Sequence, residues 1–163
     1  MSTPAFFQGF LSHERGLFGN VIGAVPDDGL EYRPEPKART ARQLFEHLIG
    51  HNLDLQELLN DGVIHHRNQV PFDSIESAVQ QLDASFGALI DELSIIDEDR
   101  WLRVGQFYAG DHLVMEAPCQ QLAWMMLLDA VHHRGQLSTY LRPMGSKVPS
   151  IYGPSADDQG EAH

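Results

Sequence analysis

The sequence predicts an all-α protein, an up-down bundle of four main helices with a short irregular insert before the last helix. Four long segments carry apolar residues at helical spacing, cap or stop residues bound these segments, and no internal repeat divides the chain. With 163 residues, 42% of them hydrophobic, the chain is one domain in size and can bury a core. We expect that domain to span residues 1–155, followed by a frayed acidic tail over residues 156–163.

The first helix is predicted over about Pro4–Ala24. Thr3 is a suitable N-cap, and the ring of Pro4 fits the first helical position. The helix must stop before Pro26, because proline cannot continue it. A proline-rich connector follows to about Lys37.

The second helix is predicted over roughly Thr40–Asn60, and Gly62 offers a left-handed stop just after it. The third helix is predicted to begin near Asp73, because Asp73 and Glu76 have the spacing of a capping box. It runs to about Ile96, where its apolar pattern ends.

The insert covers Asp97–Ala117, and its apolar residues are compatible with a short hairpin. The fourth helix is predicted over Pro118–Met144. It is apolar nearly all round in its first half, which is typical of a central helix or a subunit interface, so we expect a homodimer. At about 100° per residue, Asp129 and His133 fall at the centre of its buried face. The full stripe is Leu122, Met126, Asp129, His133, Leu137, Tyr140 and Met144.

Charge and cysteine content exclude several classes of partner. The net charge is −12, whereas nucleic-acid binding and attachment to anionic membranes both depend on clustered Lys and Arg, so we expect neither partner. No apolar run is long enough to span a bilayer, and the first residues lack the charged-then-apolar order of a signal peptide. The single cysteine, Cys119, cannot form an internal disulfide, which fits a reducing cytoplasm.

Potential metal ligands occur in pairs on two of the predicted helices. Asp129 and His133 are four residues apart and share one helix face, and His47 and His51 repeat that spacing on the second helix. Metal sites in helical bundles are assembled from side chains on facing helices. We therefore predict a site of His47, Asp129 and His133, with water or substrate in the remaining positions. Two histidines and one carboxylate suit Zn, Ni, Fe(II) or Mn(II), and the residue types do not choose among these metals.

The neighbouring polar residues have competing interpretations. His132 points about 100° away from His133, so we expect it to face substrate or to orient a ligand. Gln136 lies near the same stripe and could hydrogen-bond a ligand histidine. The histidine pair at residues 65–66 is interpreted as part of a solvated loop. Without a metal, Asp129 and His133 could simply hydrogen-bond to each other in a dry core.

The motif His-Arg-Gly-Gln-Leu at residues 133–137, together with His47-Leu48 on an earlier helix, resembles the DinB/YfiT-like superfamily of metal-dependent enzymes. The resemblance covers nearly the whole chain in helix order and length, and these two motifs are its specific signal. It implies a four-helix bundle, often dimeric, that binds a divalent metal through one histidine of the second helix and two of the last. Carried over by position, the ligands are His47, His133 and, four residues before the motif, Asp129.

The chain departs from the commonest pattern of that superfamily, which has histidine at the position of Asp129. Aspartate can still ligate, but its anionic oxygen favours harder metals. Alternatively, Asp129 orients a ligand histidine and His51 completes the site.

The resemblance also implies a class of activity. Relatives include metal-dependent transferases and isomerases that use low-molecular-weight thiols. We therefore expect a metal-dependent transferase, isomerase or hydrolase-like enzyme that acts on a small-molecule substrate, with such a thiol as a candidate co-substrate. The alternative is a non-catalytic metal-binding or structural dimer. A cavity leading to the ion would favour catalysis, and a sealed ion would favour the structural role.

Overall fold

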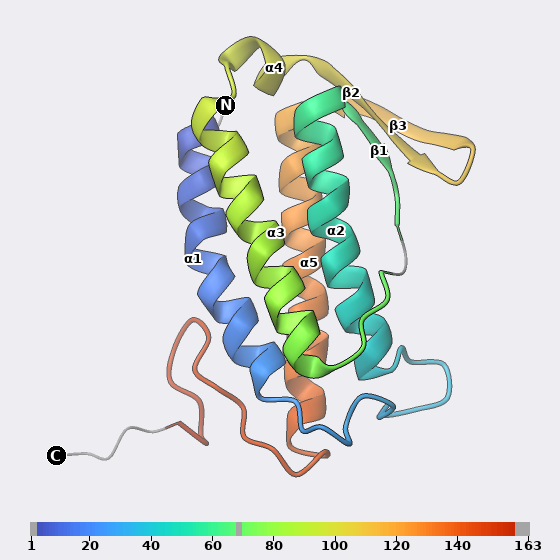
Figure 1. Cartoon of the computed structure of the whole chain (residues 1–163), viewed down its shortest axis with the longest axis vertical. Helices are drawn as coiled ribbons and strands as arrows, with labels where there is room; N and C mark the ends of the chain where they lie inside the picture. The colour runs from blue at the N-terminus through green and yellow to red at the C-terminus, as the bar shows by residue number, and fades with distance from the viewer. Residues whose placement is uncertain (1–2, 68–69, 159–163) are drawn as a thin grey trace, which may run out of the picture.

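Four long helices make up most of the computed structural model, which describes residues 3–67 and 70–158 (Figure 1). A short helix and a small three-stranded sheet lie together at one end of the long helices. The prediction of a mostly helical protein is confirmed, but the all-α class is incomplete because of this sheet. The elements are α1 (Pro4–Gly23), α2 (Ala41–Asp61), β1 (Val63–His65), α3 (Ile75–Ile95), α4 (Glu98–Leu102), β2 (Val104–Ala109), β3 (His112–Pro118) and α5 (Cys119–Leu141).

The long helices do not alternate in direction. In Figure 1, α2 and α3 run the same way, whereas α1 and α5 run the opposite way, so the predicted up-down order is wrong for α3. The reason lies in the connection from Gly62 to Ser74. An extended residue advances about 3.3 Å and a helical residue only about 1.5 Å, so this connection is long enough to return along the 21-residue helices.

Local capping interactions determine where α1 and α2 begin and end. The Thr3 hydroxyl accepts a hydrogen bond at the start of α1, and Pro4 occupies the first helical turn. Thr40 and Gln43 form a reciprocal capping box at the start of α2. Gly62 ends α2 in the left-handed region with φ 80°, as predicted.

The start of α3 differs by one residue from the prediction. Ser74, not Asp73, is the N-cap, and its hydroxyl accepts a hydrogen bond from the Ser77 backbone N–H while Ser77 reciprocates. Glu76 therefore does not complete the capping box. Both positions 73 and 74 carry good N-cap residues, so sequence spacing alone did not distinguish them.

The predicted irregular insert before α5 is ordered. Strand β2 pairs in parallel with β1 and antiparallel with β3, so the insert contains the hairpin that its apolar residues suggested. Arg100 and Arg103 donate hydrogen bonds to the carbonyls of Leu59 and Asn60, at 2.7 and 3.0 Å. The insert therefore satisfies carbonyl groups that the end of α2 would otherwise leave unpaired.

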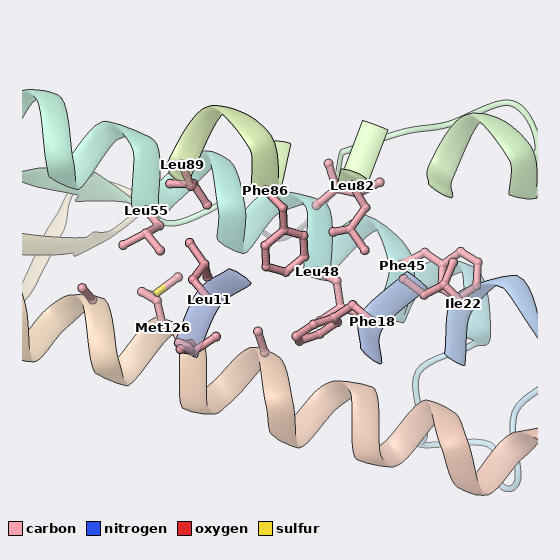
Figure 2. Packing of buried hydrophobic residues seen from close by; sticks show 14 of the residues in the cluster. Leu11, Phe18, Ile22, Phe45, Leu48, Leu55, Leu82, Phe86, Leu89 and Met126 are labelled. Atoms are coloured by element: carbon pink, nitrogen blue, oxygen red, sulfur yellow. The ribbon is translucent and has the colours of Figure 1, made fainter. Parts of the chain in front are cut away.

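The core lies between the four long helices (Figure 2). Phe18 of α1 and Phe86 of α3 are in ring contact, with their centroids 5.3 Å apart. Leu48 and Leu55 of α2 and Met126 of α5 are also buried. No helix within residues 3–67 and 70–158 is long and apolar enough to cross a membrane.

A buried ion pair joins the first and last helices. Arg134 of α5 donates a hydrogen bond to Glu14 of α1, and both side chains are almost fully buried. The Tyr152 hydroxyl accepts a hydrogen bond from Arg134 and donates one to Glu14, both at 2.7 Å. The C-terminal segment is thereby attached to α1 and α5.

The segment predicted as an acidic tail is described only as far as residue 158, and residues 159–163 lie outside the described part of the chain. The Asp157 carboxylate accepts hydrogen bonds from the Arg142 side chain and the Val148 backbone N–H. Asp158 accepts one from the backbone N–H of Ser150.

Candidate metal centre

His47 and His51 lie one turn apart on α2, and their ring centroids are 4.3 Å apart. They interrupt an apolar stripe, and only 3% of each side chain is exposed. Buried imidazoles need polar partners, because desolvation without hydrogen bonds is costly. The nearest carboxylate comes from α5.

One carboxylate oxygen of α5 lies close to all three imidazoles. Asp129 Oδ2 is 2.9 Å from His51 Nε2, 3.3 Å from His133 Nε2 and 3.9 Å from His47 Nε2. Each of the four side chains offers a ligand atom, and these atoms all lie within 4.8 Å of one another. The structure thus brings together His47, Asp129 and His133, the three predicted ligands, and adds His51.

The helical stripe placed Asp129 at the centre of the buried face of α5, and this prediction is wrong. Its side chain is 47% exposed and that of His133 is 12% exposed. Ala130 and Arg134 are buried instead. The apolar residues around α5 left the direction of the buried face ambiguous, and Arg134 could be buried because Glu14 pairs with it. The four-residue cluster therefore lies at an edge that is open to solvent.

Hydrogen bonding leaves buried histidine nitrogens unpaired. His51 Nδ1, His51 Nε2 and His47 Nδ1 have no hydrogen-bond partner among the described residues. Although His51 Nε2 is close to Asp129, it is not aligned as a hydrogen-bond donor to the carboxylate. An unpaired buried nitrogen costs about 1–3 kcal/mol, whereas a bound cation would use its lone pair. The donor set therefore fits a divalent metal ion.

The protonation states also fit a cation site. Burial, together with the neighbouring His51 and the positive charge of Arg39, lowers the pKa of His47 to about 3. The contact with His51 and the charge of His133 hold the pKa of the Asp129 carboxyl well below its ordinary value, although burial opposes this effect. At neutral pH the site therefore offers a neutral imidazole and an anionic oxygen, which are the forms that bind metals.

The other predicted residues surround His133. Gln136 Oε1 lies 2.8 Å from His133 Nδ1, so an N–H there can donate to the amide and leave the lone pair on Nε2, where Arg39 now donates and an ion could bind. The exposed His132 contacts the amide nitrogen of Gln136 at 2.9 Å and does not join the cluster. Arg39, which the sequence interpretation did not include, places Nη1 3.5 Å from His133 Nε2.

His66 is a second residue that sequence reasoning missed. Its ring centroid lies 5.3 Å from that of His47 and 5.4 Å from that of His51. The interpretation as a solvated loop is wrong for both histidines. His65 is exposed but belongs to β1, and His66 is largely buried. Its partner is Asp54, on the same helix as His51, whose carboxylate lies 2.9 Å from His66 Nδ1.

Comparison with known proteins identifies the family. The family model described as DinB family matches residues 1–161. The chain belongs to the DinB family. No curated protein matches it.

Two solved structures support the same fold for this DinB-family chain. A DinB-like protein from Bacillus subtilis has a TM-score of 0.70 at 14% identity, covering 94% of this chain and 98% of the other. A DinB-like protein from Bacillus cereus ATCC 10987 has a TM-score of 0.75 at 17% identity, covering 91% of this chain and 97% of the other. At such low identity the likeness concerns the fold.

A second group in this DinB-family protein, formed by His51, Asp54 and His66, also has metal-ligand spacing. Asp54, however, already accepts hydrogen bonds from His66 and from the backbone and side chain of Arg67. The guanidinium of Arg67 compensates the charge of this fully buried carboxylate. The cluster around Asp129 is therefore the better cation site.

A cavity of about 260 Å³ adjoins that cluster. Its polar walls are His51, His66 and Asp129, and the remaining walls are apolar. A small molecule in the cavity would therefore contact two members of the four-residue cluster. The apolar residues are Phe107, Val114, Met115, Met125 and Met126.

Proposed function

We propose that this protein is a divalent-metal-dependent enzyme that acts on a small molecule. His47, Asp129 and His133 would hold the ion, and His51 would serve as a further ligand. The convergence of four ligand atoms within 4.8 Å, with buried nitrogens that lack hydrogen-bond partners, is the observation that carries the proposal. Zn, Ni, Fe(II) and Mn(II) all accept such a mixture of imidazole and carboxylate.

The adjoining cavity and the exposure of Asp129 favour catalysis over a purely structural role. A structural ion is normally enclosed by protein ligands, whereas this edge is open to solvent and to an apolar pocket. When bound, a divalent ion lowers the pKa of a thiol or water that it contacts and so supplies a nucleophile at neutral pH. We therefore propose a thiol-dependent S-transferase or isomerase, working in the reducing cytoplasm.

The non-catalytic alternative is a metal-binding or structural dimer, in which the ion would join α2 to α5, and one exposed face supports its dimeric part. Exposed aromatic side chains gather on α1, where Phe6 and Phe10 contact Trp124 of α5. Leu128, also on α5, is 61% exposed. We propose that two copies of the chain associate through this face, since such patches on soluble proteins commonly mark interfaces. Light scattering of wild type and of a Phe6→Ser/Phe10→Ser variant tests this association, with Ile95→Ser as an exposed control.

Metal content tests the proposed function first. Untagged protein purified without chelators is measured by inductively coupled plasma mass spectrometry, beside His133→Ala and His132→Ala. We expect about one equivalent per chain in wild type and in His132→Ala, and loss in His133→Ala. The loaded protein is then assayed for transfer of cysteine and glutathione thiols to an electrophilic aryl chloride. Wild type that takes up none of the four metals would contradict the proposal.

A further inference from the structure

Arg39 is the charged residue closest to the metal cluster that the proposed function does not use. Its guanidinium Nη1 lies 3.5 Å from His133 Nε2, and the side chain is half-buried. Within residues 3–67 and 70–158, no carboxylate lies within 4 Å of this guanidinium. A cation in such a place repels a divalent ion bound beside it, and Asp129 is the one carboxylate among the four proposed ligands that offsets these charges.

The backbone holds Arg39 in this position. The Tyr140 hydroxyl of α5 donates a hydrogen bond to the Arg39 carbonyl at 3.2 Å, and the next residue, Thr40, caps α2. The positive charge of Arg39 also contributes to the low pKa of His47 and of His133, so it acts on both rings. The backbone of Arg39 is therefore held in place, and the guanidinium contacts His133 before any ligand arrives, which reduces the entropy lost on binding.

Arg39 does not line the apolar cavity, but both adjoin the four-residue cluster. Asp129 lines the cavity, its Oδ2 is 3.3 Å from His133 Nε2, and His133 Nε2 is 3.5 Å from Arg39 Nη1. A ligand that extended from the cavity past the proposed metal position would end near the guanidinium. An anionic end would be matched to Arg39, and an apolar body would be matched to Phe107 and Met115.

We propose that Arg39 selects a small carboxylate with an apolar body as the ligand of this site. The inference rests on the proposed function, because it names the substrate class of the same centre. A guanidinium is suited to the task, since it stays charged and presents paired N–H donors that match the two oxygens of a carboxylate.

Isothermal titration calorimetry with hexanoate and with the uncharged hexanamide tests this inference on metal-loaded protein. We expect Arg39→Gln to weaken hexanoate binding about tenfold and to leave hexanamide binding nearly unchanged. Arg39→Lys keeps the charge and should retain part of the hexanoate affinity. Arg33→Gln is the matched control, because Arg33 lies on the same connector and donates to the Pro36 carbonyl.

Metal content and circular dichroism are recorded for every sample. An Arg39→Gln protein that keeps its metal and its helices and binds hexanoate like wild type would overturn the role of Arg39, and so would a wild type that binds neither probe. Absence of metal from wild type contradicts the proposed function instead. In that case the same titration on metal-free protein decides the inference, since the charge of Arg39 remains.

Discussion

His51 Nε2 lies 2.9 Å from Asp129 Oδ2, and the two side chains differ sharply in exposure. The His51 side chain is 3% exposed on the inner face of α2, whereas that of Asp129 is 47% exposed on the edge of α5. The pair therefore extends from the buried core between the helices to the solvent-exposed surface. An ion held there would be anchored by a buried imidazole and still be reachable by small molecules.

Replacement of His51 tests whether it is a ligand or only a neighbour of the site. We expect His51→Ala to weaken metal affinity by at least about tenfold, because it removes a buried nitrogen that has no other partner. Competition with a chromophoric chelator measures the affinity. His65→Ala is a control on an exposed histidine, and equal affinities for the two variants would assign the site to the other three residues.

Replacement of Asp129 tests which metal the site prefers. Asp129→His exchanges an anionic oxygen for an imidazole, so we expect the preference to shift from Mn(II) towards Zn and Ni. Asp129→Asn keeps the shape but removes the charge, and it should weaken every divalent metal. Competition between metals, read by mass spectrometry, gives the order of affinities. An unchanged order in Asp129→His would mean that Asp129 does not bind the ion.

The buried Glu14–Arg134 pair should contribute far more to stability than the exposed pair of Arg15 with Asp83. Glu14→Gln leaves the buried guanidinium without its counter-charge, which typically costs about 3–5 kcal/mol. Asp83→Asn breaks a pair whose side chains are 37% and 57% exposed, so about 1 kcal/mol or less is expected. Urea unfolding of both variants gives the comparison, and similar losses would contradict it.

The Arg15–Asp83 pair should make the free energy of unfolding depend on pH in a defined direction. Hydrogen bonds from Arg15 hold the pKa of Asp83 below its usual 3.8. A lowered pKa in the folded state stabilises the protein above the unfolded value, and this contribution disappears as the pH falls through the folded value. The difference in unfolding free energy between wild type and Asp83→Asn should therefore be present at about pH 6 and shrink below about pH 3.8. A difference that grows on acidification would contradict this assignment.

Two glycines inside helices should respond oppositely to alanine. A Cβ at Gly50 of α2 would lie 2.6 Å from the Arg67 carbonyl oxygen, so Gly50→Ala must displace the chain that carries His66. We expect a loss of about 1–3 kcal/mol. A Cβ at Gly135 would meet nothing within 4 Å, and alanine should stabilise α5 by about 0.5–1 kcal/mol. Thermal unfolding measures both variants, and destabilisation by Gly135→Ala would indicate a contact absent from the single chain.

The features that the sequence predicted best are the helix ends, because residues next to each end determine them. Thr3, Thr40 and Gly62 act on the turns beside them, so the ends of α1 and α2 could be predicted from local chemistry. The direction of α3 depends instead on a connection whose path no local pattern encodes. Ser74 and Asp73 compete for the same cap, which explains the error of one residue there.

The site was predicted less completely, because its parts come from distant segments. The i, i+4 spacing of Asp129 and His133 brought them to one face, but the burial of that face depended on Arg134 and on Glu14, 120 residues away. His66 and Arg39 belong to connecting segments, where periodicity carries no information about spatial neighbours. Their roles could be recognised only once the helices were packed.

The connection between α2 and α3 has a consequence for how this protein can change. It contributes Phe72 to the core, and it supplies His66 to the cavity beside the proposed ion. Mutations there can reshape the pocket while the four-residue cluster on α2 and α5 stays intact. The pocket can therefore be altered from a connecting segment that supplies none of the four proposed metal ligands.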